Sequence, residues 1–99
     1  MKNIHTDAMK SFYKAVLSLD NEEECSLFFE DICTVKELQD IAQRLEVAKM
    51  LKEGKSYQTV SAEIGASTAT ISRVNRCLVY GNGGYETVLG RIKGEKKDD

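Results

Sequence analysis

The residues with the clearest chemical potential lie in the stretch STATISRVNR, which runs from Ser67 to Arg76. Short hydroxyl side chains bond phosphates or bases, directly or through water, and they let a helix backbone sit deep in a groove. Arginine bonds guanine or phosphate, and small apolar groups contact the methyl group of thymine. The stretch therefore offers DNA contacts from Ser67, Thr68, Ala69, Thr70, Ser72, Arg73 and Arg76.

Three polar residues just before this stretch are further candidates for DNA binding. They are Lys55, Tyr57 and Gln58, at or next to the start of a predicted helix. The backbone N–H groups at the N-terminus of a helix favour anions. We therefore expect these side chains to contact DNA phosphates, and ordinary surface exposure is the alternative interpretation of each.

Two short helices joined by a tight turn are predicted between Lys55 and Leu78 to position these residues. A side-chain oxygen at a helix start accepts hydrogen bonds from backbone N–H groups that have no partner within the helix, and a glycine after a helix end tolerates positive φ. Ser56 and Ser67 fit the first role, and Gly65 fits the second. This is the helix-turn-helix pattern, whose second helix enters the DNA major groove. The small core between the crossed helices is expected from Val60, Ile64, Ala66, Ile71 and Val74.

Caps and apolar spacing predict three more helices before this motif. The first spans residues 7–18, and the second follows Asp20 or Asn21 as its cap. Thr34 opens a capping box with a glutamate three residues later, and it starts the longest helix, 35–53. The chain before the motif is therefore expected to be entirely helical.

The second of these helices has two unusual features. Phe28 and Phe29 are adjacent and cannot share one face, so we expect the helix to bury one side in its own subunit and another against a partner. Residues 20–37 also hold seven acidic residues and one lysine. This acidic segment must point away from DNA or attract a different partner.

The chain after the motif is predicted to turn and form one last helix. Three glycines break the segment 80–85, and apolar spacing resumes over residues 85–93. Residues 95–99 are expected to be a disordered tail. The expected organisation is a single all-α domain, 1–94, that comprises dimerisation helices (1–53), the helix-turn-helix (55–78) and the C-terminal helix (85–93).

Composition limits the classes of function that fit. The 99 residues are 41% hydrophobic and 30% charged, which indicates one globular domain. No apolar run reaches the roughly 18 residues of a membrane helix, so we expect a cytoplasmic protein without a membrane partner. The net charge of −2 argues against a nonspecific polyanion binder. With one histidine and no paired catalytic groups, we expect no enzyme.

The cysteines give no sign of a disulfide framework or a metal site. Cys25, Cys33 and Cys77 are odd in number and form no close CxxC pair. We expect buried free thiols, no bound metal and no cofactor.

Residues 34–78 resemble the Trp repressor family, and the whole chain is similar to its YerC/YecD-type branch. The stretches DICTVKEL, QRLEVAKMLKEG and GASTATISR carry the likeness. The resemblance implies six helices in an intertwined homodimer that binds double-stranded DNA. It also implies a transcription regulator, and a repressor in particular, whose two recognition helices read a palindromic operator one turn of DNA apart.

The resemblance also implies a possible ligand pocket. Thr34 matches a threonine that faces the ligand from the neighbouring subunit, and Arg44 and Arg73 match the arginines that sandwich the indole of the corepressor. Val74 replaces a glycine against the indole, and Cys77 replaces a serine that bonds the ligand amine. Because a β-branched side chain partly fills the cavity, we expect no classical L-tryptophan corepression. Another small-molecule effector, or none, stays open.

Two points are open from the sequence. Arg73 has a candidate role toward DNA and another toward a ligand, and the sequence is compatible with both. The alternative function is a protein-interaction module that retains the fold without binding an operator. The acidic overall charge and the acidic second helix motivate this alternative.

Overall fold

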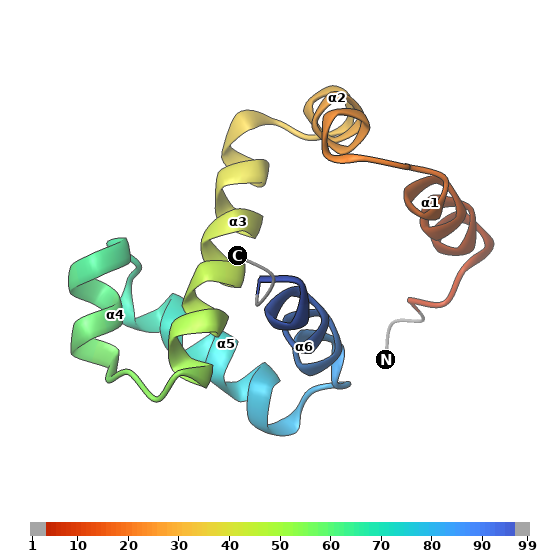
Figure 1. The fold of residues 1–99 in the computed structure, drawn as a ribbon. Helices are drawn as coiled ribbons and strands as arrows, with labels where there is room; N and C mark the ends of the chain where they lie inside the picture. The colour runs from red at the N-terminus through yellow and green to blue at the C-terminus, as the bar shows by residue number, and fades with distance from the viewer. Residues whose placement is uncertain (1–3, 97–99) are drawn as a thin grey trace. The chain divides into compact units, whose positions relative to one another are not determined.

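The computed structural model describes residues 4–96, and within that range it contains six α-helices and no strand (Figure 1). The all-α expectation and the predicted helix order are confirmed. The first and third helices end one residue earlier than expected. The last helix spans 84–96 where 85–93 was expected, so it includes residues 95 and 96 of the expected tail, and residues 97–99 lie outside the described range. The helices are α1 (Asp7–Leu17), α2 (Glu22–Ile32), α3 (Val35–Lys52), α4 (Tyr57–Ile64), α5 (Thr68–Tyr80) and α6 (Gly84–Lys96).

The predicted caps account for two of the first three helix starts. The Asn21 side chain accepts a hydrogen bond from the backbone N–H of Glu24 at 2.8 Å, so Asn21 and not Asp20 caps α2. The capping box of α3 is reciprocal. The Glu37 N–H donates to Thr34 Oγ1 at 3.0 Å, and the Thr34 N–H donates to Glu37 Oε1 at 2.8 Å. Local sequence therefore fixes where these helices begin.

The contacts divide the chain into two compact units, residues 1–38 and 39–99. The division falls inside α3, after its first turn. The first unit holds α1, α2 and the first turn of α3. The second unit holds the rest of α3 and the helices α4, α5 and α6.

Aromatic rings join α1 to α2 within the first unit. Phe12 lies 6.3 Å from Phe28 and 6.5 Å from Phe29, measured between ring centroids. No residue of either helix is fully buried, and large apolar side chains are left exposed. They are Tyr13, Leu17, Leu27 and Ile32. Two short helices cannot enclose a core by themselves. Phe28 and Phe29 are both half-buried within this unit, and burial of another side of α2 against a partner stays a prediction.

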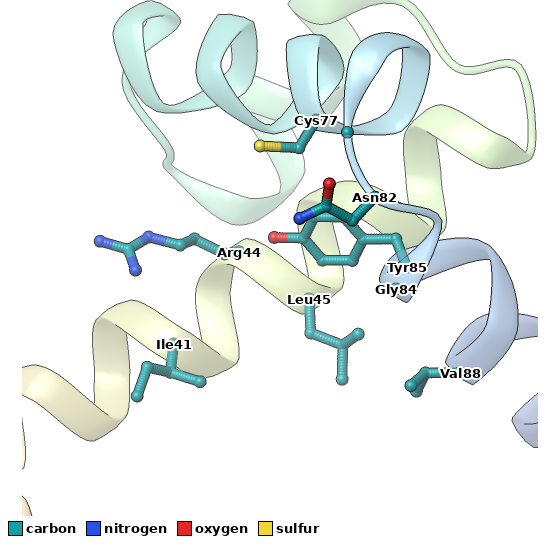
Figure 2. A pocket seen from close by; sticks show the side chains of 9 residues that line it. Ile41, Arg44, Leu45, Cys77, Asn82, Gly84, Tyr85 and Val88 are labelled. Atoms are coloured by element: carbon teal, nitrogen blue, oxygen red, sulfur yellow. The ribbon is translucent and has the colours of Figure 1, made fainter. Parts of the chain in front are cut away.

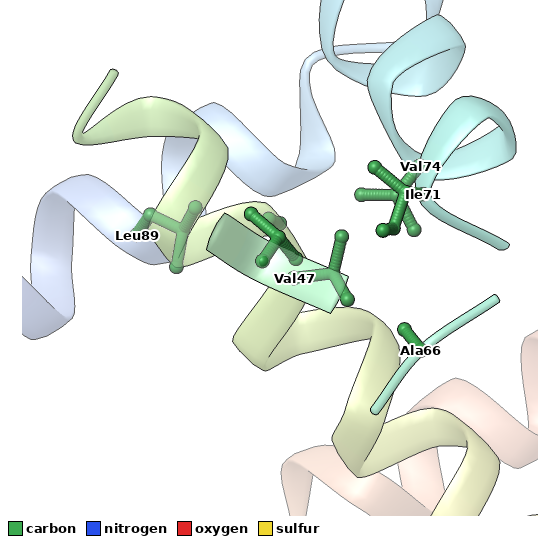
Figure 3. Close-up of a cluster of buried hydrophobic side chains, with 7 residues drawn as sticks. Val47, Ala66, Ile71, Val74 and Leu89 are labelled. Atoms are coloured by element: carbon green, nitrogen blue, oxygen red, sulfur yellow. The ribbon is translucent and has the colours of Figure 1, made fainter. Parts of the chain in front are cut away.

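The core of the second unit draws on all four of its helices. Val47 of α3 and Leu89 of α6 join the buried residues of the helix-turn-helix (Figure 3). Ala48 of α3 belongs to the same buried cluster. Four of the five residues expected in the motif core are buried and Ile64 is partly buried, which confirms this set. The buried members from the motif are Val60, Ala66, Ile71 and Val74.

The expectation of buried thiols is wrong for the described chain. Cys25 and Cys77 are exposed, and Cys33 is only partly buried. Cys25 lies on a helix that its own unit leaves uncovered, and Cys77 of α5 is exposed where it lines a cavity between α3, α5 and α6. Among residues 4–96 no cluster of His, Cys, Asp and Glu side chains could hold a metal ion, and no helix is long and apolar enough to cross a membrane.

Candidate nucleic-acid interface

The two helices of the motif start in the same way. Ser56 Oγ accepts a hydrogen bond from the Thr59 N–H at 3.1 Å, and Ser67 Oγ accepts one from the Thr70 N–H at 3.1 Å. Between them Gly65 has a φ of +82°, and its N–H donates to the Ser61 carbonyl at 2.8 Å. Positive φ at a helix C-terminus is the conformation that favours glycine. The turn therefore forms as the sequence predicted.

The core side of α5 determines which residues it presents to solvent. Ile71 and Val74 are 0% and 1% exposed, so the opposite side of the helix faces outward. Thr70 alone among the ten predicted DNA contacts is partly buried, and its hydroxyl accepts a hydrogen bond from Ser67 Oγ at 3.1 Å. The exposed residues are Lys55, Tyr57, Gln58, Ser67, Thr68, Ala69, Ser72, Arg73 and Arg76.

Two surface hollows lie on this exposed side. The first, which we call the neutral hollow, has a volume of about 340 Å³ and is lined by Tyr57, Gln58, Ser61, Ala62 and Thr68. The second, which we call the cationic hollow, has a volume of about 250 Å³ and is lined by Ala69, Ser72, Arg73 and Arg76. The adjacent residues Thr68 and Ala69 each line one of them.

The cations of the motif differ in their partners. The Lys55 ammonium lies 4.0 Å from a Glu53 carboxylate oxygen and 3.9 Å from one of Glu63. Neither Arg73 nor Arg76 forms an ion pair with any residue in the described range. The positive charge of the motif is therefore uncompensated at the cationic hollow and partly compensated at Lys55.

A separate cavity of about 590 Å³ lies between α3, α5 and α6. Figure 2 shows Arg44 of α3, Cys77 of α5 and Tyr85 of α6 at its walls. Its lining is mostly apolar, and Ile41 and Val88 are 50% and 45% exposed. The full lining is Ile41, Arg44, Leu45, Cys77, Gly81, Asn82, Gly84, Tyr85 and Val88.

The cavity contains only part of the predicted ligand pocket. Arg44 and Cys77 line it, whereas Arg73 lines the cationic hollow and Val74 is 1% exposed in the core. Thr34 belongs to the first unit, whereas every residue that lines the cavity belongs to the second. The resemblance did not point to Tyr85, which the sequence analysis placed only at the start of the expected last helix, 85–93.

Comparisons with known proteins agree with this architecture. Residues 7–93 match the family described as Trp repressor protein. The chain is 55% identical over 85 residues to YerC of Bacillus subtilis (strain 168), which is described as uncharacterised, and the match covers 86% of this chain and 82% of YerC.

Two solved structures are similar over most of their length. One is the crystal structure of a Trp repressor candidate from Staphylococcus aureus, with a TM-score of 0.88, 50% identity and coverage of 91% of this chain and 90% of that one. The other is a TrpR-like protein from Eubacterium eligens ATCC 27750, with a TM-score of 0.88, 49% identity and coverage of 91% and 93%.

Proposed function

The chain belongs to the Trp repressor family, and we propose that it is a transcription regulator that binds a palindromic DNA operator as a homodimer. The observation that carries the proposal is the outward side of the helix-turn-helix. Nine of its ten candidate DNA contacts are exposed there, and its two arginines have no acidic partner in the described range. Such a surface suits insertion of α5 into a major groove.

The proposed role of each residue toward DNA follows from the chemistry of its side chain. Thr68 and Ala69 begin α5 and face the bases, where a methyl group can contact thymine. Ser67 and Thr70 bond each other, so their main role is to fix the start of the helix. Lys55, Tyr57, Gln58, Ser72, Arg73 and Arg76 position the protein on the sugar–phosphate backbone.

The homodimer is supported by the apolar surface of the first unit. Leu17 is 83% exposed, Leu27 61% and Ile32 53%. Exposed apolar side chains on two adjacent helices indicate a surface that a partner covers, and a twofold dimer also matches the symmetry of a palindromic operator.

We propose repression as the mode of regulation, since a bound dimer blocks access to the DNA it covers. We also propose that the protein acts in the cytoplasm.

We propose that free L-tryptophan is not the corepressor. Val74 fills core space and does not line the cavity beside Arg44, and Arg73 lies at a different hollow. The different positions of Arg44 and Arg73, at the cavity and at the cationic hollow, support this proposal. No cofactor and no catalytic step form part of the proposal.

The test of operator binding is a pull-down of fragmented genomic DNA of the source organism, followed by gel shifts on the enriched fragments. We expect the wild-type protein to enrich a few fragments and to shift them in preference to shuffled sequence. Arg73→Ala is expected to weaken these shifts. Equal shifts of all fragments by both proteins would contradict sequence-specific binding.

The acidic start of α2 favours one second candidate, a protein-interaction module that does not bind an operator. Glu22, Glu23 and Glu24 are exposed in the first turn of this helix. Reversing these three charges is expected to abolish binding of a protein partner if this candidate is correct. If every interaction survives the reversal, the candidate loses its basis.

A further inference from the structure

We propose that the two hollows hold phosphates of the two opposite DNA strands, and that of these two contacts only the one at the cationic hollow adds to the salt dependence of binding. This inference rests on the proposed function and deepens it. It assigns Arg73 and Arg76 to phosphate, whereas the residue types alone also allow guanine.

The first step is the placement of the hollows around α5. Thr68 lines the neutral hollow and Ala69 lines the cationic hollow. Consecutive residues of an α-helix point about 100° apart because one turn takes 3.6 residues. The exposed pair Thr68 and Ala69 therefore forms a ridge with one hollow on either side.

The second step compares this ridge with the dimensions of DNA. An α-helix with its side chains is about 10–12 Å across, and the major groove is about 12 Å wide. A helix that fills the groove brings both of its flanks close to the two sugar–phosphate backbones that border it. With the ridge at the bases, each hollow faces one strand.

The third step is the chemistry of the cationic hollow. One guanidinium satisfies both major-groove acceptors of a guanine, O6 and N7. Here two guanidinium groups and the Ser72 hydroxyl line the same small space, and no carboxylate lines it. A DNA phosphate shares one negative charge between two non-bridging oxygens that each accept several hydrogen bonds, so it matches this set of donors better than one base edge does. Ala69 leaves room for the phosphate to approach the helix.

The neutral hollow offers a different kind of contact. Its polar lining consists of the Tyr57 and Thr68 hydroxyls, the Ser61 hydroxyl and the Gln58 amide, with no charged side chain. Neutral donors bind a phosphate and fix the register of the protein without adding a positive charge. Binding at this hollow therefore adds affinity but little salt dependence.

The test measures the dissociation constant against salt concentration on a duplex that the wild-type protein selects from a random pool. Neutralising one phosphate contact changes the slope of log affinity against log salt by about 0.9. For the double variant Arg73→Gln and Arg76→Gln we therefore expect a slope shallower by about 1.8 per dimer, and for either single variant a slope shallower by part of that amount. Each arginine variant is expected to lose the same factor in affinity on the selected duplex and on duplexes that differ from it by one base pair.

Three comparisons complete the design. Tyr57→Phe combined with Gln58→Ala is expected to weaken binding about 10-fold at one salt concentration, with an unchanged slope. Arg91→Gln, on the exposed surface of α6, removes the same charge outside the motif and is expected to leave the slope nearly unchanged. Thermal melting of every variant verifies that it is folded.

Each remaining outcome decides against the inference. An Arg73 or Arg76 variant that loses affinity only on duplexes carrying one particular guanine, with an unchanged slope, would assign that arginine to base reading. A slope that falls in the Tyr57 and Gln58 variant would overturn the neutral role of that hollow. If the wild-type protein selects no duplex at all, the proposed function itself fails, and this inference fails with it.

Discussion

Ser67 and Thr70 exchange two hydrogen bonds at the start of the recognition helix. The Thr70 N–H donates to Ser67 Oγ at 3.1 Å, and Ser67 Oγ–H donates to Thr70 Oγ1 at 3.1 Å. Ser56 and Thr59 repeat the same arrangement at the start of α4. Both helices of the motif are thus anchored by a serine and by the threonine three residues later.

This pairing predicts that Ser67 contributes to stability independently of DNA. Ser67→Ala removes the only side-chain acceptor recorded for the Thr70 N–H, and loss of an N-cap costs about 1 kcal/mol. We expect a free energy of unfolding lower by about that amount in urea denaturation without DNA. Ser72→Ala, at an exposed position without a cap role, is the matched control and is expected to change stability by less than about 0.5 kcal/mol.

The turn of the motif predicts opposite effects for two glycines. Gly65 has a φ of +82°, and a Cβ there would meet no atom within 4 Å, so Gly65→Ala introduces backbone strain without a steric clash. We expect a loss of about 1–2 kcal/mol. Gly90 lies inside α6 with equally free space, and Gly90→Ala is expected to stabilise by about 0.5–1 kcal/mol. Thermal or urea unfolding measures both, and equal effects would contradict the described backbone.

Glu63 is predicted to weaken DNA binding through Lys55. Its carboxylate lies 3.9 Å from the Lys55 ammonium, and both side chains are exposed. Since exposed pairs contribute about 0.2–1 kcal/mol, Glu63→Gln is expected to tighten binding several-fold in fluorescence anisotropy at low salt. Glu46→Gln removes the same charge on α3, where the carboxylate pairs with Lys49 at 3.0 Å. An equal gain in this control would show a general charge effect and no specific role of Lys55.

The first unit predicts a variant that dissociates the dimer. Leu27 is 61% exposed on α2, so Leu27→Glu costs the isolated subunit little but places a charge in the proposed interface. We expect a shift from dimer to monomer in light scattering coupled to size-exclusion chromatography. Lys14→Glu, at an exposed polar position on α1, is the control. A wild-type protein that is monomeric at every concentration would contradict the dimer.

Local rules explain what the sequence could predict. A cap such as Asn21 or Thr34 acts on a backbone group three residues away, and the Gly65 turn depends on its own φ. The motif core also follows from spacing, because Val60 and Ile71 are brought together by that one turn. Features that depend on neighbours only a few residues away can thus be predicted from the local sequence.

Features that depend on distant packing could not be predicted in this way. Tyr85 reaches the cavity beside Arg44 only because α6 packs against α3 and α5, which residue spacing does not specify. Cys77 is exposed for a related reason, since burial depends on which helices cover a given side of α5. Two adjacent residues can also differ in burial: Arg73 lies at the surface, whereas Val74 lies in the core.

The selection of DNA from a random-sequence pool tests the central claim most directly. We expect the wild-type dimer to enrich a palindrome whose half-site centres lie about 10 base pairs apart, the spacing that places two recognition helices one helical turn apart. The variant with both Arg73→Ala and Arg76→Ala is expected to enrich the same palindrome less strongly, because the lost phosphate contacts lower its affinity for all sequences alike. A wild-type protein that enriches no sequence over repeated rounds, while folded and dimeric, would contradict the account.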